Sequence, residues 1–207
     1  MTEWTQRAHV LADHAVSGVL GHVSSLHFDT MSELLWVGSA SGQLTSHTGA
    51  LPTLPRYTSL AAHGVPKQPK HVRGILSDDK FIISLSEGRV CASQRQGLGR
   101  WSMQIEDHAP GVALAGLCAS PQSASSDIIV GGAAPNSHDA LFALHSISGR
   151  VVRSAVSDGT VTQLRKGSRY LCVGTEQGTI QLHDPRSLSA EHKLPAHHGG
   201  LIDLQTD

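Results

Sequence analysis

The most numerous potential metal ligands in this 207-residue sequence are its 14 histidines. Zinc sites in proteins usually combine closely spaced ligand pairs, often two cysteines with two histidines. No cysteine pair accompanies the histidines here, and they fall at different positions of the repeat described below. The densest group is His192, His197 and His198, with His183 nearby. We therefore interpret the histidines as solvated or turn residues and predict no metal site.

Glycine-rich segments are the next candidates for chemistry. Residues 38–42 suggest the Gly-x-Ser-x-Gly turn of a hydrolase, but the central position is Ala40. Residues 97–102 lack the third glycine and the strand–turn–helix context of a dinucleotide site, and no P-loop is present. Asp78 and Asp79 belong to a turn before the expected strand at Phe81, so they do not predict a two-metal site. The sequence thus predicts no catalytic, cofactor-binding or metal-binding residue, and no cofactor for this segment.

Two small basic groups could contact RNA phosphates or an acidic partner. Neither is interleaved with exposed aromatic residues, so no stacking platform for nucleic-acid bases is visible. A solvated loop is the favoured interpretation of each group. Trp36 and Trp101 alternate with polar neighbours and are expected in the core or between repeats rather than as binding anchors. The basic groups are Lys67, Lys70, His71 and Arg73, and Arg165, Lys166 and Arg169.

Composition narrows the class of protein. With 16 Lys+Arg and 17 Asp+Glu the net charge is −1, which argues against a strongly basic nucleic-acid binder, and 39% hydrophobic residues argue against disorder. The N-terminus lacks the apolar region of a secretory signal, and no apolar stretch is long enough to span a bilayer. Cys91, Cys118 and Cys172 lie in separate apolar segments, which favours reduced thiols. We expect a soluble intracellular protein without a membrane partner.

The elements that must position these residues form an internal repeat. Residues 34–44 resemble residues 170–180: each has an apolar run, a glycine, a three-residue turn, a second glycine and another alternating run. Such a pattern is typical of a β-hairpin whose turn requires glycine. Residues 81–90 are a shorter copy, and residues 128–144 are a longer one with a turn-rich insert. The sequence therefore predicts four hairpins.

Each hairpin is flanked by two further apolar stretches. An apolar pair precedes it, and the second members of successive pairs are 49, 42, 47 and 40 residues apart. A fourth stretch follows it, at residues 57–60, 101–105, 151–156 and 192–194. Four strands per repeat at a mean spacing of 44.5 residues indicate the blades of a WD40-type β-propeller, an all-β fold. The apolar pairs are Val23/Leu26, Val72/Ile75, Leu114/Leu117, Val161/Leu164 and Leu201/Leu204.

Histidine ends several of the segments between repeats: His22, His63, His108 and His197. In WD40 blades a histidine at this point often bridges to an aspartate in a turn. No third strand ends in the Trp-Asp dipeptide, however, and His183-Asp184 comes nearest. The four-strand period is thus stronger support for the fold than the motif residues.

The repeats predict an incomplete ring of about four four-stranded blades plus the first strand of a fifth. Residues 1–22 are a lead-in that contains a candidate ring-closing strand at residues 8–11, and residues 23–207 form the partial propeller. Propellers close with four to eight blades. We therefore expect a fragment of a longer protein whose open blade faces make the isolated chain prone to association.

Several stretches together resemble one WD40 family specifically. The chain is similar, over nearly its whole length, to the N-terminal propeller of the catalytic subunit of the poly(A)-nuclease deadenylation complex, a PAB-dependent poly(A)-specific ribonuclease. Generic WD40 features explain the glycines, but Arg56-Tyr57-Thr58-Ser59 before Ala62-His63, and residues 92–98, are less generic. The other stretches are residues 34–38 with 42–46, and residues 72–76, 83–86, 127–132 and 178–186.

The resemblance implies a scaffold rather than an enzyme. In that family a linker that binds a pseudokinase partner subunit, a hydrolase-like domain and a metal-dependent nuclease follow the propeller. No position of this sequence matches the nuclease motifs, so no catalytic residue is carried over, and the divalent metal belongs to the nuclease domain absent from this chain. The implied partners are the pseudokinase subunit and, indirectly, mRNA coated with poly(A)-binding protein. The implied role is cytoplasmic mRNA decay, with P-bodies as a candidate location.

Two other hypotheses remain open at this point. A generic WD40 adaptor unrelated to deadenylation needs only the blades, and it predicts no association with the pseudokinase subunit. A free-standing enzyme with histidine or metal chemistry predicts stoichiometric zinc in the purified chain.

Overall fold

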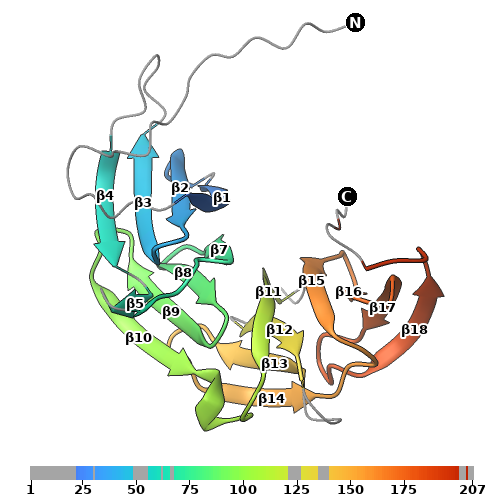
Figure 1. The fold of residues 1–207 in the computed structure, drawn as a ribbon. Coiled ribbons are helices and arrows are strands. Elements are labelled where there is room, and N and C mark those ends of the chain that lie inside the picture. Colours follow the sequence, from blue (N-terminus) through green and yellow to red (C-terminus); the bar gives the residue numbers. More distant parts are fainter. Residues whose placement is uncertain are drawn as a thin grey trace, which may run out of the picture.

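The computed structural model describes residues 22–29, 31–48, 56–61, 63–65, 68–120, 127–134, 140–200 and 204. These residues form four four-stranded antiparallel sheets and a two-stranded one, with a single 3₁₀ turn as the only helical segment among them. The four large sheets follow one another in an arc around an open centre (Figure 1). This arrangement confirms an all-β, partial WD40-type propeller.

The four large sheets are the predicted blades. Blade 1 contains β1 (Val23–Asp29), β2 (Leu34–Ser39), β3 (Gln43–Thr48) and β4 (Arg56–Ala61). Blade 2 contains β7 (Gly74–Ser77), β8 (Phe81–Ser86), β9 (Arg89–Gln94) and β10 (Gly99–Gln104). Blade 3 contains β11 (Ala113–Ala119), β12 (Asp127–Ala133), β13 (Leu141–His145) and β14 (Val151–Ala155). Blade 4 contains β15 (Val161–Lys166), β16 (Leu171–Thr175), β17 (Thr179–His183) and β18 (Ala190–Pro195).

Within each blade the strands pair in chain order. The first strands β1, β7, β11 and β15 line the centre of the arc, and the last strands β4, β10, β14 and β18 lie at its outside (Figure 1). β11 contacts both β7 and β15, and β1 contacts β7. The short strands β5 (Gly64–Val65) and β6 (Gln68–Pro69) connect blade 1 to blade 2, and the 3₁₀ turn η1 (Ile105–Asp107) follows β10.

The hydrophobic core lies between blades rather than in one central mass. The largest cluster joins β8 and β9 to β12 and β13, and a second joins blades 3 and 4. A third cluster packs Trp36 of β2 and Leu44 of β3 against Ile82 of β8. Since neighbouring sheets bury their apolar faces against each other, each blade is stabilised mainly by the next one.

Trp36 and Trp101 confirm the expected packing role of the tryptophans. Trp36 is fully buried in blade 1. Trp101 of β10 donates its indole N–H to the carbonyl oxygen of Ser146 in blade 3, at 2.7 Å, and so joins two blades. This carbonyl satisfies the polar end of an otherwise apolar ring.

Gly42 and Gly178 explain why the hairpins need glycine. Both have a positive φ, 83° and 79°, in the turn between the second and third strands of blades 1 and 4. The carbonyl oxygen of Gly42 accepts a hydrogen bond from the amide of His63, and that of Gly178 accepts one from His197, each at 3.0 Å. A Cβ at Gly42 would lie 1.8 Å from the carbonyl oxygen of His63. The glycine repeat in the sequence thus corresponds to the same backbone hydrogen bond in blades 1 and 4.

Two predicted strand limits differ from the structure, and two predicted strands lie outside or almost outside the described residues. Val72, expected to begin the first strand of blade 2, lies before β7, where its amide donates to the carbonyl of Ser39 at 3.1 Å. Ile105 belongs to the 3₁₀ turn and not to the fourth strand. The candidate closing strand at residues 8–11 lies outside the described residues, as does the fifth-blade strand except for Leu204, which is not in a strand.

Candidate functional site

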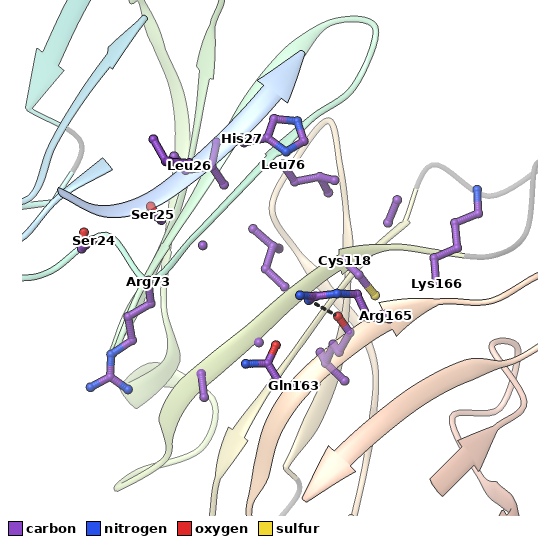
Figure 2. Close-up of a pocket in the computed structure, with 17 residues that line it drawn as sticks. Ser24, Ser25, Leu26, His27, Arg73, Leu76, Cys118, Gln163, Arg165 and Lys166 are labelled. Carbon is purple, nitrogen blue, oxygen red and sulfur yellow. Dashed lines mark hydrogen bonds between the residues drawn. The ribbon is translucent and has the colours of Figure 1, made fainter. Parts of the chain in front are cut away.

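The inner strands of all four blades enclose a central groove with a volume of about 580 Å³. It is lined by residues 24–27 of β1, 73–76 at the start of β7, 115–119 of β11 and 163–166 of β15. Gly74, Ala115 and Gly116 are among the lining residues, as is Leu26, which is 63% exposed. Figure 2 shows these segments side by side around the groove.

The groove is cationic although the chain as a whole carries a charge of −1. Arg73, Arg165 and Lys166 line it, and none of its 17 lining residues is acidic. The Arg73 guanidinium lies 3.3 Å from Glu87, which is outside the lining, and also donates to the carbonyl oxygen of Leu114 at 3.3 Å. The charges of Arg165 and Lys166 favour the thiolate of Cys118, yet burial dominates and raises the pKa of that thiol to about 12.

The structure brings together parts of the two basic groups that the sequence keeps about 90 residues apart. Arg73 comes from the first group and Arg165 and Lys166 from the second. The solvated-loop interpretation is wrong for Arg165 and Lys166, because both belong to β15. It fits Arg169, which is exposed after that strand. Lys67 lies outside the described residues.

The C-terminal histidines do not converge. His183 is buried on β17, where its Nδ1–H donates to the carbonyl oxygen of Leu188 at 2.8 Å, and burial lowers its pKa. His192 lies on the exposed strand β18 and meets the ring of Tyr170 edge-on, at 6.1 Å between centroids. His198 is exposed. Across the described ranges, no three His, Cys, Asp or Glu side chains are grouped so that they could hold a metal ion.

His63 ends the segment between blades 1 and 2, where a WD40 histidine often bridges to an aspartate. In this structure its partners are different. Its Nε2 lies 2.9 Å from the hydroxyl of Ser84 on β8, and its Nδ1 lies 3.9 Å from the thiol of Cys91 on β9. Burial lowers the pKa of His63 to about 4, with the charge of Arg89 acting in the same direction. Neutral His63 therefore ties the end of blade 1 to blade 2 at neutral pH.

Two further contacts between blades 1 and 2 gave no signal in the sequence. Arg95, after β9, forms an ion pair with the fully buried Asp29 and donates to the hydroxyl of Ser32 at 2.9 Å. His27 of β1 accepts a hydrogen bond at Nε2 from the amide of Ser77 at 3.2 Å. Burial, and then the charge of Arg95, lower the pKa of His27, so this nitrogen stays available as an acceptor.

The three cysteines are free thiols in this structure. Cys91 and Cys118 are buried and Cys172 is half-buried. Burial raises the pKa of Cys91 to about 11 and also raises that of Cys172. Since the thiolate is the reactive form, these cysteines are poor nucleophiles at neutral pH.

No helix among the described residues has the length and apolarity needed to cross a bilayer.

Comparison with known proteins shows which propeller this is. The family model described as PAN2 N-terminal matches residues 8–207. The chain belongs to the PAN2 family. This agrees with the resemblance found in the sequence.

Curated PAN2 relatives cover most of the chain. It is 36% identical over 182 residues to the PAN2-PAN3 deadenylation complex catalytic subunit of Aspergillus oryzae, and 31% identical over 183 residues to that of Phaeosphaeria nodorum. These alignments cover 87% and 88% of the chain but 14% and 15% of the relatives. The chain thus spans about 15% of the length of the PAN2 subunits that it matches.

Solved structures show the same fold. The Pan2 WD40 domain of Neurospora crassa superposes with a TM-score of 0.77 at 24% identity, over 95% of this chain and 57% of that one. The WD40 propeller domain of Doa1 gives a TM-score of 0.65 at 13% identity, over 84% of this chain and 55% of that one. The four blades therefore correspond to somewhat more than half of each of these PAN2 and Doa1 propellers.

Proposed function

We propose that this chain is the N-terminal propeller of a PAN2-type deadenylase subunit and that it serves as a scaffold in the shortening of mRNA poly(A) tails. The observation that carries the proposal is the match to the PAN2 N-terminal family over residues 8–207. Relatives that the chain matches are named as catalytic subunits of the PAN2-PAN3 deadenylation complex. Catalysis itself is assigned to a nuclease domain that uses divalent metal, and no residue of this segment is given a catalytic role.

The proposed scaffold organises two partners. One is the regulatory subunit that corresponds to PAN3, a pseudokinase by family resemblance, and the other is poly(A) RNA coated with poly(A)-binding protein. The proposed place of action is the cytoplasm, including P-bodies. A rigid set of blades held by buried inter-blade contacts suits this role, because such a fold presents several surfaces in fixed relative positions.

Purification of the protein, tagged at its own gene, tests the assignment. The expected result is that the PAN3-like subunit copurifies and that loss of the gene lengthens poly(A) tails across cellular mRNAs. The alternative of a generic WD40 adaptor predicts neither result. Purification without a PAN3-like subunit, together with unchanged tail lengths in cells lacking the gene, would overturn the proposal in favour of the adaptor.

A further inference from the structure

The central groove has a composition that suits one kind of ligand. It combines three cationic side chains with exposed apolar ones, and Leu26 alone leaves 63% of its surface open to solvent. Its volume of about 580 Å³ lies within the range of ligand-binding sites. A cationic site with an apolar wall complements a ligand that carries both carboxylates and apolar groups.

The chemistry of the lining discriminates between anions. Arginine and lysine bind carboxylates and phosphates alike, so charge alone does not separate a peptide from RNA. Single-stranded RNA is usually held by aromatic side chains that stack on its bases, and none of the 17 lining residues is Phe, Tyr or Trp. A bare phosphate ion, in turn, would leave Leu26, Leu76 and Leu117 without a partner.

The placement of the charges fits an extended ligand. In Figure 2 Arg165 extends from β15 toward β11, whereas Arg73 lies across the groove beside the segment that leads into β7. Gly74 and Gly116 also line the groove, and a Cβ at Gly116 would lie 2.9 Å from the side chain of Leu164, so this glycine allows β11 to approach β15 closely.

We propose that the central groove binds an acidic peptide segment of a partner protein, with its carboxylates on Arg165, Lys166 and Arg73 and its apolar side chains on Leu26 and Leu76. The proposal does not rest on a role in deadenylation, since it uses only the lining of the groove. Binding would be weakened by salt, because the ion pairs form at a solvent-accessible surface.

The test is a titration of the full-length protein, produced from its complete gene, against a fluorescein-labelled peptide that alternates glutamate with leucine. Three comparison ligands are a peptide with lysine in place of glutamate, one with serine in place of leucine, and oligoadenylate RNA. The glutamate–leucine peptide is expected to bind, and each of the two altered peptides to bind about tenfold more weakly.

Two substitutions in the groove and one outside it make the result specific. Arg165→Glu is expected to weaken peptide binding about tenfold, and Leu26→Ser about fivefold, since the first removes an ion pair and the second an apolar contact. Arg100→Glu makes the same charge change on the exposed outer strand β10 and is expected to leave binding unchanged. Leu26 is 63% exposed among the described residues, so its replacement removes no buried contact from them.

Three outcomes would overturn the proposal: no binding of the glutamate–leucine peptide, an equal loss for Arg165→Glu and Arg100→Glu, or binding of oligoadenylate but not of the peptide through Arg165. Circular dichroism melting curves confirm that the variants are folded. Failure here leaves tail lengths and PAN3 copurification unaffected, so it is distinguishable from failure of the deadenylase assignment.

Discussion

Gly42 sits where the hairpin of blade 1 meets the segment that leads into blade 2. Its φ of 83° is costly for any residue with a side chain, and a Cβ there would meet the carbonyl oxygen of His63 at 1.8 Å. We predict that Gly42→Ala lowers the free energy of unfolding by about 3 kcal/mol, because both the backbone and the contact must yield. Urea denaturation measures this change.

Gly99 provides the matched control for this prediction. A Cβ at Gly99, on β10, would meet nothing within 4 Å. Gly99→Ala should therefore change the free energy of unfolding by less than about 0.5 kcal/mol. Equal effects of the two alanine substitutions would show that the close approach at Gly42 is not what the fold requires.

For single residues, the sequence predicted the glycine-containing turns better than the ion pairs. The spacing of glycines and apolar runs indicated the turns that contain Gly42 and Gly178, because a turn is a local feature. Arg95 and Asp29 are 66 residues apart, and neither stands in a motif, so nothing local marks their ion pair. Arg165 lies on β15, although its basic group is interpreted from the sequence as a solvated loop.

At the scale of elements, neutral His63 at the junction of blades 1 and 2 makes the free energy of unfolding depend on pH. Its folded-state pKa of about 4 lies below the unfolded value of 6.5, so at intermediate pH the unfolded chain binds more protons. The stability due to neutral His63 is fully present above pH 6.5 and is lost as the pH falls toward 4. The predicted loss between pH 7.5 and pH 4.5 is about 2 to 3 kcal/mol.

His63→Gln isolates this contribution, because glutamine does not titrate and can still hydrogen-bond to Ser84. The difference in unfolding free energy between wild type and His63→Gln should shrink in this pH range as the pH falls. The lowered pKa values of His27 and His183 act in the same direction in both proteins and cancel in the difference. A difference that does not vary with pH would contradict a neutral, buried His63.

Arg95 supports the same junction by a different interaction. It neutralises Asp29, whose side chain is fully buried, and it reaches the carbonyl oxygen of Asp78 in the turn before β8. Arg95→Ala should cost about 3 to 5 kcal/mol, because it leaves a buried carboxylate without its counter-ion. Thermal unfolding provides the measurement, and Arg100→Ala on β10 should have little effect. Addition of Asp29→Asn to Arg95→Ala should recover part of the loss; no recovery would mean that Arg95 acts through packing alone.

The strands themselves were the most predictable elements. Alternating apolar runs bounded by glycine placed all four hairpins, because strand periodicity and turn chemistry are both written in neighbouring residues. The first strand of blade 2 begins at Gly74, after the predicted Val72, which is fully buried although it precedes the strand. Burial pattern alone does not distinguish such a segment from a strand.

For the whole molecule, an exposed apolar face at the end of β1 predicts association. This face contains Phe28, which is 56% exposed, and Met31 of the following turn, which is 67% exposed. Exposed apolar surface of this kind favours self-association. We predict that the 207-residue polypeptide sediments with a concentration-dependent coefficient and that Phe28→Ser reduces this dependence. The exposed Leu98→Ser, outside this face, is the control; equal effects of the two would argue against β1 as the interface.

The central groove is the feature that the sequence predicted least well. Its cations come from β15 and from the segment just before β7, and they line one groove only because the blades curve around one centre. The family, by contrast, was evident from the sequence, since the blade period and the less generic stretches at residues 56–63 and 92–98 extend over nearly the whole chain. Local patterns therefore predicted the architecture, and only the assembled blades show the surface.

The rate of poly(A) removal by the purified complex shows whether this propeller serves a deadenylase. The measurement compares RNA coated with poly(A)-binding protein with bare poly(A), using the complex with and without residues 23–200. If the nuclease lies outside this segment, as proposed, loss of the propeller should slow removal on coated RNA much more than on bare RNA. Equal rates on coated RNA with and without the propeller would show that it does not serve deadenylation.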